Sequence, residues 1–166
     1  MVEKYYNKET NTLTLPYDFN EELCNLSSNT KVIIFEEDYS KKQHSLFNQP
    51  VNNLPDSITH LTFGRHFNQP VNYLPNSITH LTFGCEFNQS VGHQGCEDIN
   101  CPRNLPNSIT HLTFGISFNR PVDNLPLFLQ QIQFNYKTKE EILSIMKKVP
   151  FGCKILNERD EEIFLQ

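Results

Sequence analysis

The sequence contains no tryptophan and only six glycines in 166 residues. It also lacks an uninterrupted apolar run of about 18 residues, the length that a membrane-spanning helix needs, so we expect no such helix. Residues 1–10 are polar and include no apolar segment, so we expect no secretory signal peptide. The length suits a single domain or one elongated array.

Clustered positive charge is also missing. The chain has 14 Lys and Arg residues against 19 Asp and Glu residues, a formal net charge of −5, and no basic block. Because contacts to phosphates need clustered positive charge, we expect neither a nucleic acid nor a membrane surface as a partner. The five cysteines are an odd number without an export signal, so we interpret them as reduced thiols of a cytoplasmic protein.

Phenylalanine is in excess, with 13 residues, and the cause is an internal repeat. Residues Phe47–Gly64 recur as Phe67–Gly84 with two substitutions. A third copy begins at Phe87 and a fourth at Phe118, separated by an insertion near residues 92–102. The chain is therefore a repeat array with local interruptions.

A weaker copy begins at Phe19, because Phe19-Asn20 aligns with Phe47-Asn48 and a second insertion then spans residues 36–46. The sequence thus predicts three parts. These are an N-terminal cap with a leading strand over residues 1–18, five repeats of about 20 residues over 19–136, and a helix and strand cap over 137–166.

Ten of the 13 phenylalanines fall into two repeat columns. Each unit of an array buries its apolar face only against its neighbours, so identical residues at one repeat position stack. We predict a structural spine that includes Phe47, Phe63, Phe67, Phe83, Phe87, Phe114 and Phe118.

The segment Ile58-x-x-Leu61-x-Phe63 has the spacing of the strand in leucine-rich repeats, where alternate apolar residues point inward. The rest of the copy carries Pro50 and Pro55 and has no helical period. We predict a right-handed, leucine-rich-repeat-like solenoid with a parallel β-sheet of about six strands on its concave side. The convex side is expected to be extended or polyproline-like, and an α+β cap closes the C-terminal end.

Two polar or small columns follow each strand. Gly64, Gly84 and Gly115 stand where the chain must turn, so we expect positive φ angles there. The next column is asparagine, whose buried amide can satisfy loop N–H and C=O groups that no sheet satisfies. The predicted ladder comprises Asn48, Asn68, Asn88 and Asn119.

The unit Phe-Asn-Gln-Pro-Val…Leu-Pro-x-Ser-Ile-x-x-Leu-x-Phe-Gly closely resembles the FNIP repeat, over roughly residues 19–136. That family is found mainly in social amoebae and in giant viruses that infect amoebae. The resemblance implies a leucine-rich-repeat-like solenoid without catalytic activity. Family members often carry an N-terminal F-box that recruits a ubiquitin ligase, but Val32–Phe35 is typical of a strand rather than of the helices of an F-box. We therefore expect no complete F-box in this chain.

Polar side chains on the strands form the candidate binding face. Strand alternation places one histidine column and one threonine column on the outward face of the sheet. This face suits a protein partner or a pH-responsive surface, or its histidines are copied without a role. A metal site is the weakest alternative, because imidazoles on adjacent parallel strands point the same way and rarely converge on one ion. The residues are His60, Thr62, His80, Thr82, His111 and Thr113.

The insertion near residues 92–102 carries His93, Cys96 and Cys101. A Cys-x4-Cys pair with a nearby histidine is a weak zinc signal, because zinc sites usually pair Cys-x2-Cys units and Cys85 would have to be the fourth ligand. We therefore expect no cofactor, with zinc binding and a redox-active pair as minor alternatives to incidental thiols. Long loops on repeat arrays often carry the recognition surface, so the insertion is also a candidate binding element.

The C-terminal part predicts a cap. Thr138-x-x-Glu141 is a capping box that starts a helix, with Lys147 and Lys148 in its last turn and Pro150 after it. Residues 152–156 and 162–165 are typical of two short strands that form a hairpin.

No catalytic motif is present in the sequence. We therefore predict a non-enzymatic protein-interaction module that presents the solenoid surface and the inserted loop to an unknown protein partner, a host protein if the chain is viral. The alternative hypotheses are a substrate adaptor in host ubiquitylation without a complete F-box and, as the weakest, a small zinc-binding protein. The sequence leaves the oligomeric state open.

Overall fold

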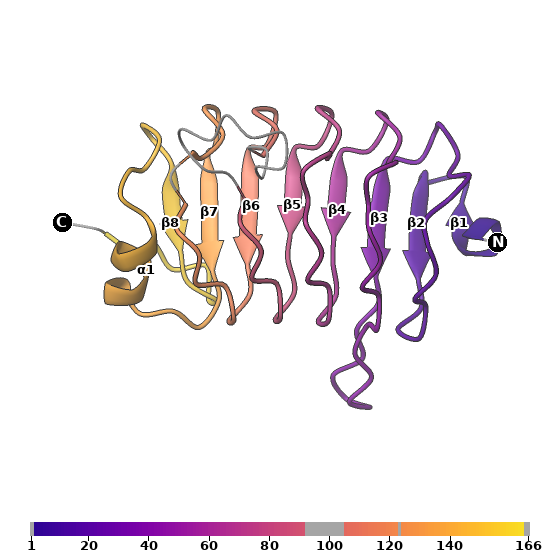
Figure 1. Ribbon diagram of the computed structural model, residues 1–166, viewed down its shortest axis with the longest axis horizontal. Coiled ribbons are helices and arrows are strands. Elements are labelled where there is room, and N and C mark those ends of the chain that lie inside the picture. Colours follow the sequence, from indigo (N-terminus) through magenta and orange to yellow (C-terminus); the bar gives the residue numbers. More distant parts are fainter. Residues whose placement is uncertain (1, 92–104, 123, 165–166) are drawn as a thin grey trace.

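A computed structural model describes residues 2–91, 105–122 and 124–164. In this part of the chain, eight strands form one sheet whose spatial order is the order of the sequence (Figure 1). A short 3-10 helix, η1 (Val2–Tyr5), precedes β1 (Tyr6–Asn7), which pairs antiparallel with β2. The strands that follow are β2 (Thr12–Leu15), β3 (Val32–Phe35), β4 (His60–Thr62), β5 (His80–Thr82), β6 (His111–Phe114), β7 (Gln131–Phe134) and β8 (Lys154–Leu156).

From β2 to β8 every pairing is parallel, so each turn of the chain adds one strand to the sheet. The segments that return from β3 to β7 contain no helix among the described residues and consist of extended chain and turns (Figure 1). The predicted leucine-rich-repeat-like solenoid is confirmed. It has one parallel strand more than expected, because β8 of the cap extends the sheet.

Equivalent residues of successive repeats lie side by side. Leu61 pairs with Leu81 and Leu81 with Leu112, and all three side chains are buried. Ile58 and its equivalents are buried beside them. A repeat in the sequence therefore becomes a column in the core, in which every apolar residue packs on its own copies.

The phenylalanines form a double stack inside the solenoid. Where one copy ends and the next begins, the rings of Phe63 and Phe67 are parallel with centroids 3.7 Å apart. Equivalent rings of successive copies, such as Phe67 and Phe87, stack at 6.1 Å. The pairs Phe83–Phe87 and Phe114–Phe118 repeat the short contact at 3.7 and 3.8 Å, and Phe35–Phe47 does so at 4.1 Å. Offset-stacked pairs with centroids about 4.5–7 Å apart, such as Phe67–Phe87, add about 0.5–1.5 kcal/mol beyond their burial, so these contacts hold neighbouring repeats together.

The chain reaches each strand from β4 to β8 through the same four-residue turn, here called a proline turn. Its first residue is proline, and the N–H of its fourth residue donates to the proline carbonyl. The donor–acceptor distances are 3.2 Å for Pro55–Ile58, 3.3 Å for Pro75–Ile78, 3.1 Å for Pro106–Ile109, 3.2 Å for Pro126–Leu129 and 3.1 Å for Pro150–Cys153. This hydrogen bond fixes the turn whatever the two middle residues are.

The glycines after the strands do not have the predicted positive φ angles; among the described glycines only Gly152 does, with φ of 77°. Close approach of backbones explains the column instead. A Cβ on Gly84 would lie 2.1 Å from the carbonyl oxygen of Gly64, and one on Gly115 would lie 2.1 Å from that of Gly84. These positions therefore exclude any side chain, although their backbone angles suit other residues.

At the C-terminal end, helix α1 (Lys139–Ile145) covers the core with the buried side chains of Ile142 and Ile145. Its N-cap Thr138 forms the predicted capping box with Glu141. The helix is shorter than expected, since Met146 ends it and Lys147 and Lys148 follow it. The expected hairpin is reduced to a single antiparallel bridge between Leu156 and Glu162, while β8 itself pairs with β7.

The insertion at residues 36–46 projects from the solenoid below β3 in Figure 1. An antiparallel bridge between Asp38 and Gln43 closes it. At its base the Glu37 carboxylate accepts hydrogen bonds from the backbone N–H groups of Ser45 and Arg65 and lies 2.8 Å from Nδ1 of His44. This anchored loop was predicted only as an insertion, because one of its partners, Arg65, lies beyond the next strand.

Candidate functional site

The outward side chains of β2 to β7 form two rows across the sheet, which together are called the outer face. Strand alternation sends the leucine and isoleucine between them into the core. None of these residues carries a full charge at neutral pH with neutral histidines, so the face is polar but uncharged. One row is Thr12, Val32, His60, His80, His111 and Gln131, and the other is Thr14, Ile34, Thr62, Thr82, Thr113 and Gln133.

The three histidines of the outer face stack on one another. The ring centroids of His60 and His80 are 4.2 Å apart with an interplanar angle of 11°, and those of His80 and His111 are 4.3 Å apart with an angle of 7°. The spacing is close to that of neighbouring strands, so the in-register pairing of β4, β5 and β6 produces the stack.

A threonine orients each ring. Nδ1 of His80 lies 2.9 Å from Oγ1 of Thr79, and that hydroxyl donates to the carbonyl of Thr59 in the preceding repeat at 3.1 Å. Both contacts are hydrogen bonds only if Nδ1–H donates to the hydroxyl, which leaves Nε2 unprotonated. His60 and His111 have the same contacts, at 2.8 and 2.9 Å, with the threonine before each. The outer face therefore presents a row of three equivalent imidazole edges.

Partial burial, with smaller contributions from the imidazoles of His60 and His111, lowers the pKa of His80. Protonation of the central ring is thus disfavoured, and the neutral form with Nε2 as an acceptor is maintained at neutral pH.

This geometry does not suit a metal ion. Lone pairs on parallel stacked rings point in the same direction and do not converge on one centre. Within the described residues, no group of three or more histidine, cysteine, aspartate or glutamate side chains is arranged to hold a metal. His93, Cys96 and Cys101, the weak zinc candidates, lie outside the described residues.

The cysteines that the structure describes do not form a reactive centre. Cys24, Cys85 and Cys153 are free thiols in separate parts of the fold. Burial raises the pKa of Cys153 to about 11, so its thiol stays protonated at neutral pH and is a poor nucleophile.

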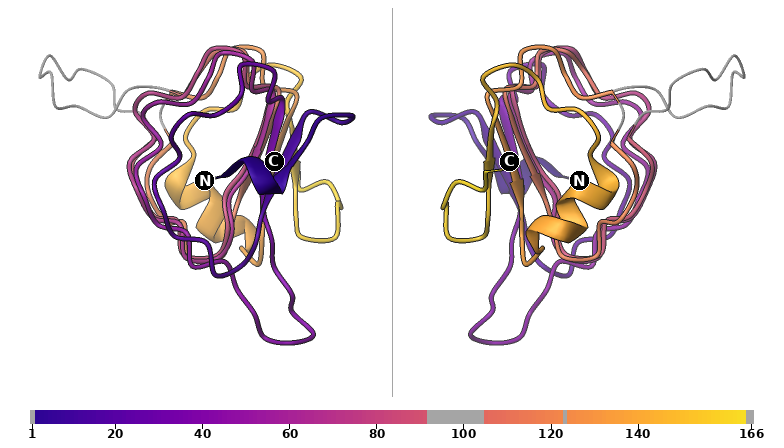
Figure 2. Two further views of the ribbon diagram at one scale, coloured as in Figure 1. Left: turned by 90° about the vertical axis from the view of Figure 1, so that its right-hand side faces the viewer. Right: turned by 90° about the vertical axis from the view of Figure 1, so that its left-hand side faces the viewer.

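Two segments project from the same side of the sheet and flank the outer face (Figure 2). One is the β1–β2 hairpin, drawn in indigo, and the other is the turn at residues 157–161 after β8, drawn in yellow. Gln133 of the outer face contacts the second one, because its Nε2 donates to the carbonyl of Asn157 at 2.8 Å. The outer face thus lies between two projecting segments.

The predicted asparagines form a ladder on another side of the repeat. Each side-chain Oδ1 accepts a hydrogen bond from the backbone N–H of the equivalent asparagine one repeat later: Asn48 from Asn68, Asn68 from Asn88, and Asn88 from Asn119, at 2.9 to 3.0 Å. Asn20 begins the ladder by accepting from the N–H of Asn48 at 2.9 Å. Sequence reasoning left Asn20 out, although its alignment with Asn48 carried the signal.

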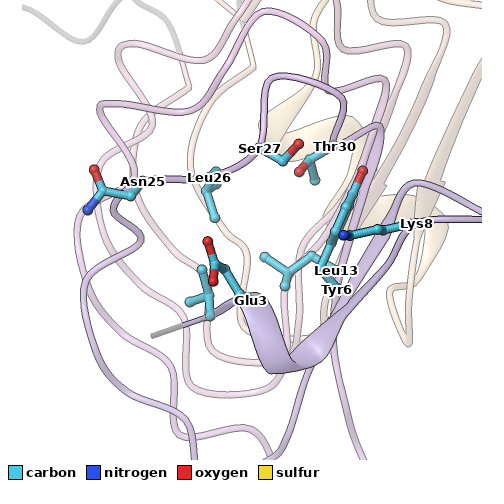
Figure 3. A pocket seen from close by; sticks show the side chains of 9 residues that line it. Glu3, Tyr6, Lys8, Leu13, Asn25, Leu26, Ser27 and Thr30 are labelled. Atoms are coloured by element: carbon cyan, nitrogen blue, oxygen red, sulfur yellow. The ribbon is translucent and has the colours of Figure 1, made fainter.

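The N-terminal end of the solenoid contains a pocket of 390 Å³ (Figure 3). Leu13 and Leu26 line it together with the polar residues Glu3, Lys8 and Asn25. Its lining also includes Tyr6, Ser27 and Thr30 and has neither histidine nor cysteine among the described residues.

Fold and site together define a β-solenoid repeat protein with a leucine-rich-repeat-like architecture. Within that class, the model of the family described as FNIP Repeat matches residues 47–86 and 101–137, so the chain contains FNIP repeats. The resemblance found in the sequence is therefore confirmed.

A solved structure described as a novel circular LRR protein, CroV588 from a giant virus, is 31% identical with a TM-score of 0.43. The match covers 89% of this chain and 27% of that one, so the chain spans about a quarter of the length of that protein. The comparison with curated proteins found no match. Among the described residues, no helix combines the length and apolar character needed to cross a membrane.

Proposed function

We propose that the chain is a non-enzymatic protein-interaction module and that its outer face binds a protein partner. The single observation that carries this proposal is the histidine stack, held in register by β4, β5 and β6 and edged by threonines. The core lies on the opposite side of each strand, so burial does not account for these side chains.

The chemistry of the outer face suits protein recognition. Cores of protein interfaces are depleted of charged residues, and this face has none among its two rows. The exposed edges of the imidazoles and the hydroxyls of Thr62, Thr82 and Thr113 supply hydrogen-bonding groups. Because the sheet fixes these groups before binding, less conformational entropy is lost when a partner docks.

Affinity capture with the tagged chain tests this proposal. The variant His80→Ala/Thr82→Ala changes the centre of the outer face, and Asn52→Ala/Asn53→Ala changes exposed residues on the returning segment as a matched control. We expect the first variant to lose partners that the wild type and the control retain. If both variants capture the same partners as the wild type, the outer face is not the binding surface.

A further variant without residues 92–102 tests whether the insertion takes part in binding. Loss of the same partners would assign the insertion to the interface, and retention would exclude it. Capture of a ubiquitin-ligase subunit by the wild type, lost in the outer-face variant, would identify the partner as ligase machinery and support the adaptor hypothesis. Capture without any ligase subunit would reject that hypothesis.

A further inference from the structure

The exposed residues of the proline turns change in character along the solenoid. The second residue of the turn is Asp56, Asn76 and Asn107 before β4, β5 and β6, and all three are exposed. In the next two turns the same position holds Leu127, which is 74% exposed, and Phe151, which is fully exposed. The backbone hydrogen bond of the turn is the same in all five, so the change concerns the surface and not the fold.

The third residue of the turn changes as well. Ser57, Ser77 and Ser108 each donate a hydrogen bond of 2.7 Å to a carbonyl of the preceding repeat. In the fourth turn this serine is replaced by Phe128, which is 70% exposed and gives up that hydrogen bond. A hydrogen-bonded serine in the earlier turns is thus replaced here by a large apolar side chain that is exposed to solvent.

Two exposed apolar residues of the last two turns, Leu127 and Phe151, line the same groove. β7 and β8 are neighbours, and the N–H of Lys154 donates to the carbonyl of Gln130 at 2.8 Å, which brings the turns before these strands side by side. Between them is a groove of 480 Å³. This volume falls in the range of about 300–1,000 Å³ that is usual for binding pockets. The apolar part of its lining is Leu105, Leu125, Leu127, Val149, Pro150 and Phe151.

The described residues that line this groove carry one charge, and it is positive. Among them Lys148 is the only charged residue, and Lys147 precedes it. Residues 147–154 contain three lysines and no acidic residue, although the whole chain has a net charge of −5. Among the described residues, neither Lys147 nor Lys148 has an ion-pair partner. A carboxylate bound here would gain an ion pair without displacing an existing one.

We propose that the last two proline turns form a docking surface, here called the C-terminal groove, for an acidic segment of a partner protein that carries large apolar side chains. Leu127 and Phe151 contact the apolar side chains of that segment, and Lys147 and Lys148 pair with its carboxylates. Contiguous exposed apolar residues rimmed by polar ones mark interaction sites in soluble proteins. This surface is separate from the outer face and does not depend on its role.

A random peptide library displayed on phage, with peptides of about 12 residues, provides the probe. The tagged wild-type chain is expected to enrich peptides that combine Asp or Glu with Phe, Leu, Ile or Trp. The variant Leu127→Asn/Phe128→Ser/Phe151→Asn restores the polar residues of the earlier turns and is expected to bind the enriched peptides at least about tenfold more weakly. Lys147→Glu/Lys148→Glu is expected to weaken the same peptides and to shift the selection toward basic ones.

Two control variants separate a local effect from a general one. Ile116→Ser removes an exposed apolar residue elsewhere, and Lys31→Glu reverses an exposed charge near β3. Both are expected to bind the enriched peptides as the wild type does. Thermal unfolding of every variant verifies that the fold is intact, which is expected because Asn and Ser occupy the same positions in the earlier turns.

Three outcomes would overturn the proposal. Enrichment of peptides without acidic residues would show that the charge argument is wrong. Equal binding by the triple variant and the wild type would place the peptide site elsewhere. A concentration-dependent dimer of the wild type in sedimentation, absent in the triple variant, would show that a second copy of the chain occupies the groove instead of a partner segment.

Discussion

The proline turns before β4, β5 and β6, called the middle turns, and those before β7 and β8, called the last turns, have the same backbone hydrogen bond and different surfaces. The middle turns expose Asp or Asn and lead into strands that carry histidine. The last turns expose Leu127 and Phe151 and lead into strands that carry Gln131 and Lys154. The comparison shows that proline and the core columns determine the turn, so its middle residues are free to vary with function.

The largest expected effect comes from adding a methyl group to a glycine in each region. In Gly84→Ala the new Cβ meets the backbone of Gly64, which cannot move without shifting the sheet, so we expect a loss of more than about 3 kcal/mol in the free energy of unfolding. In Gly152→Ala nothing lies within 4 Å of the Cβ, and only the positive φ of 77° opposes the substitution. There we expect a loss of about 1 kcal/mol.

Urea denaturation monitored by circular dichroism measures both values. Similar losses for the two variants would mean that the neighbouring backbones shift at little cost to relieve the crowding at Gly84. Gly115→Ala, which meets the carbonyl of Gly84, should behave as Gly84→Ala does.

The asparagine ladder is expected to matter more than the asparagine of a middle turn. Asn68→Ala leaves the backbone N–H of Asn88 without its acceptor in a partly buried position, and we expect a loss of about 2 kcal/mol in unfolding free energy. Asn107 accepts only an exposed hydrogen bond of 3.3 Å from the N–H of Leu127, so Asn107→Ala should change the unfolding free energy by less than about 0.5 kcal/mol. If both substitutions changed the unfolding free energy equally in urea denaturation, the asparagine ladder would not be a special source of stability.

Substitutions at the third position of a middle turn and of a last turn are expected to differ less in their effect on the unfolding free energy. Ser108→Ala removes a hydrogen bond of 2.7 Å to the carbonyl of Ile78 and is expected to lower the unfolding free energy by about 1 kcal/mol. Phe128→Ser removes an exposed side chain and introduces a hydroxyl at the equivalent position, so stability should stay the same or rise by about 0.5 kcal/mol. A marked loss of stability in Phe128→Ser would show that this ring serves the fold, which would argue against a role in docking.

The regular part of the fold could be predicted from the sequence because each repeat packs on its copies. The repeat columns that contain Phe63, Leu61 and Ile58 indicate both where the strand lies and which of its side chains are buried. The role of Gly84 could not be predicted in the same way, since turn conformation and backbone crowding both favour glycine and only the position of the neighbouring repeat separates them.

The candidate sites were predictable to different degrees. The alternation of His80 and Thr82 with buried residues placed them on one face, but the stacking of the rings depends on the register between strands. The C-terminal groove was not predicted, because its residues come from both the last repeat and the C-terminal cap. The sequence did indicate it at Leu127 and Phe128, where large apolar residues replace Asn and Ser. The pattern becomes clear only when the structure shows that Phe151 occupies the same turn position as Leu127.

The smallest expected effect concerns the pH dependence of stability. We expect this dependence to arise from β4, β5 and β6, which carry the histidines, and not from β7 and β8. Because the pKa of His80 is lowered in the folded state, the unfolded chain binds more protons as the pH falls through the ordinary value of 6.5. The contribution of neutral His80 to the free energy of unfolding is therefore fully present above about pH 7. It is lost as the pH falls from that value through the lowered pKa of His80. In His80→Gln we expect a smaller decrease in melting temperature between about pH 7 and pH 5 than in the wild type, measured by circular dichroism. Thr82→Val, a neighbouring change without a titrating group, should retain the wild-type decrease. If the melting temperature of His80→Gln fell as much as that of the wild type, the stacked rings would not couple protonation to folding. The strands that carry histidine would then differ from β7 and β8 only in the groups they offer to a partner.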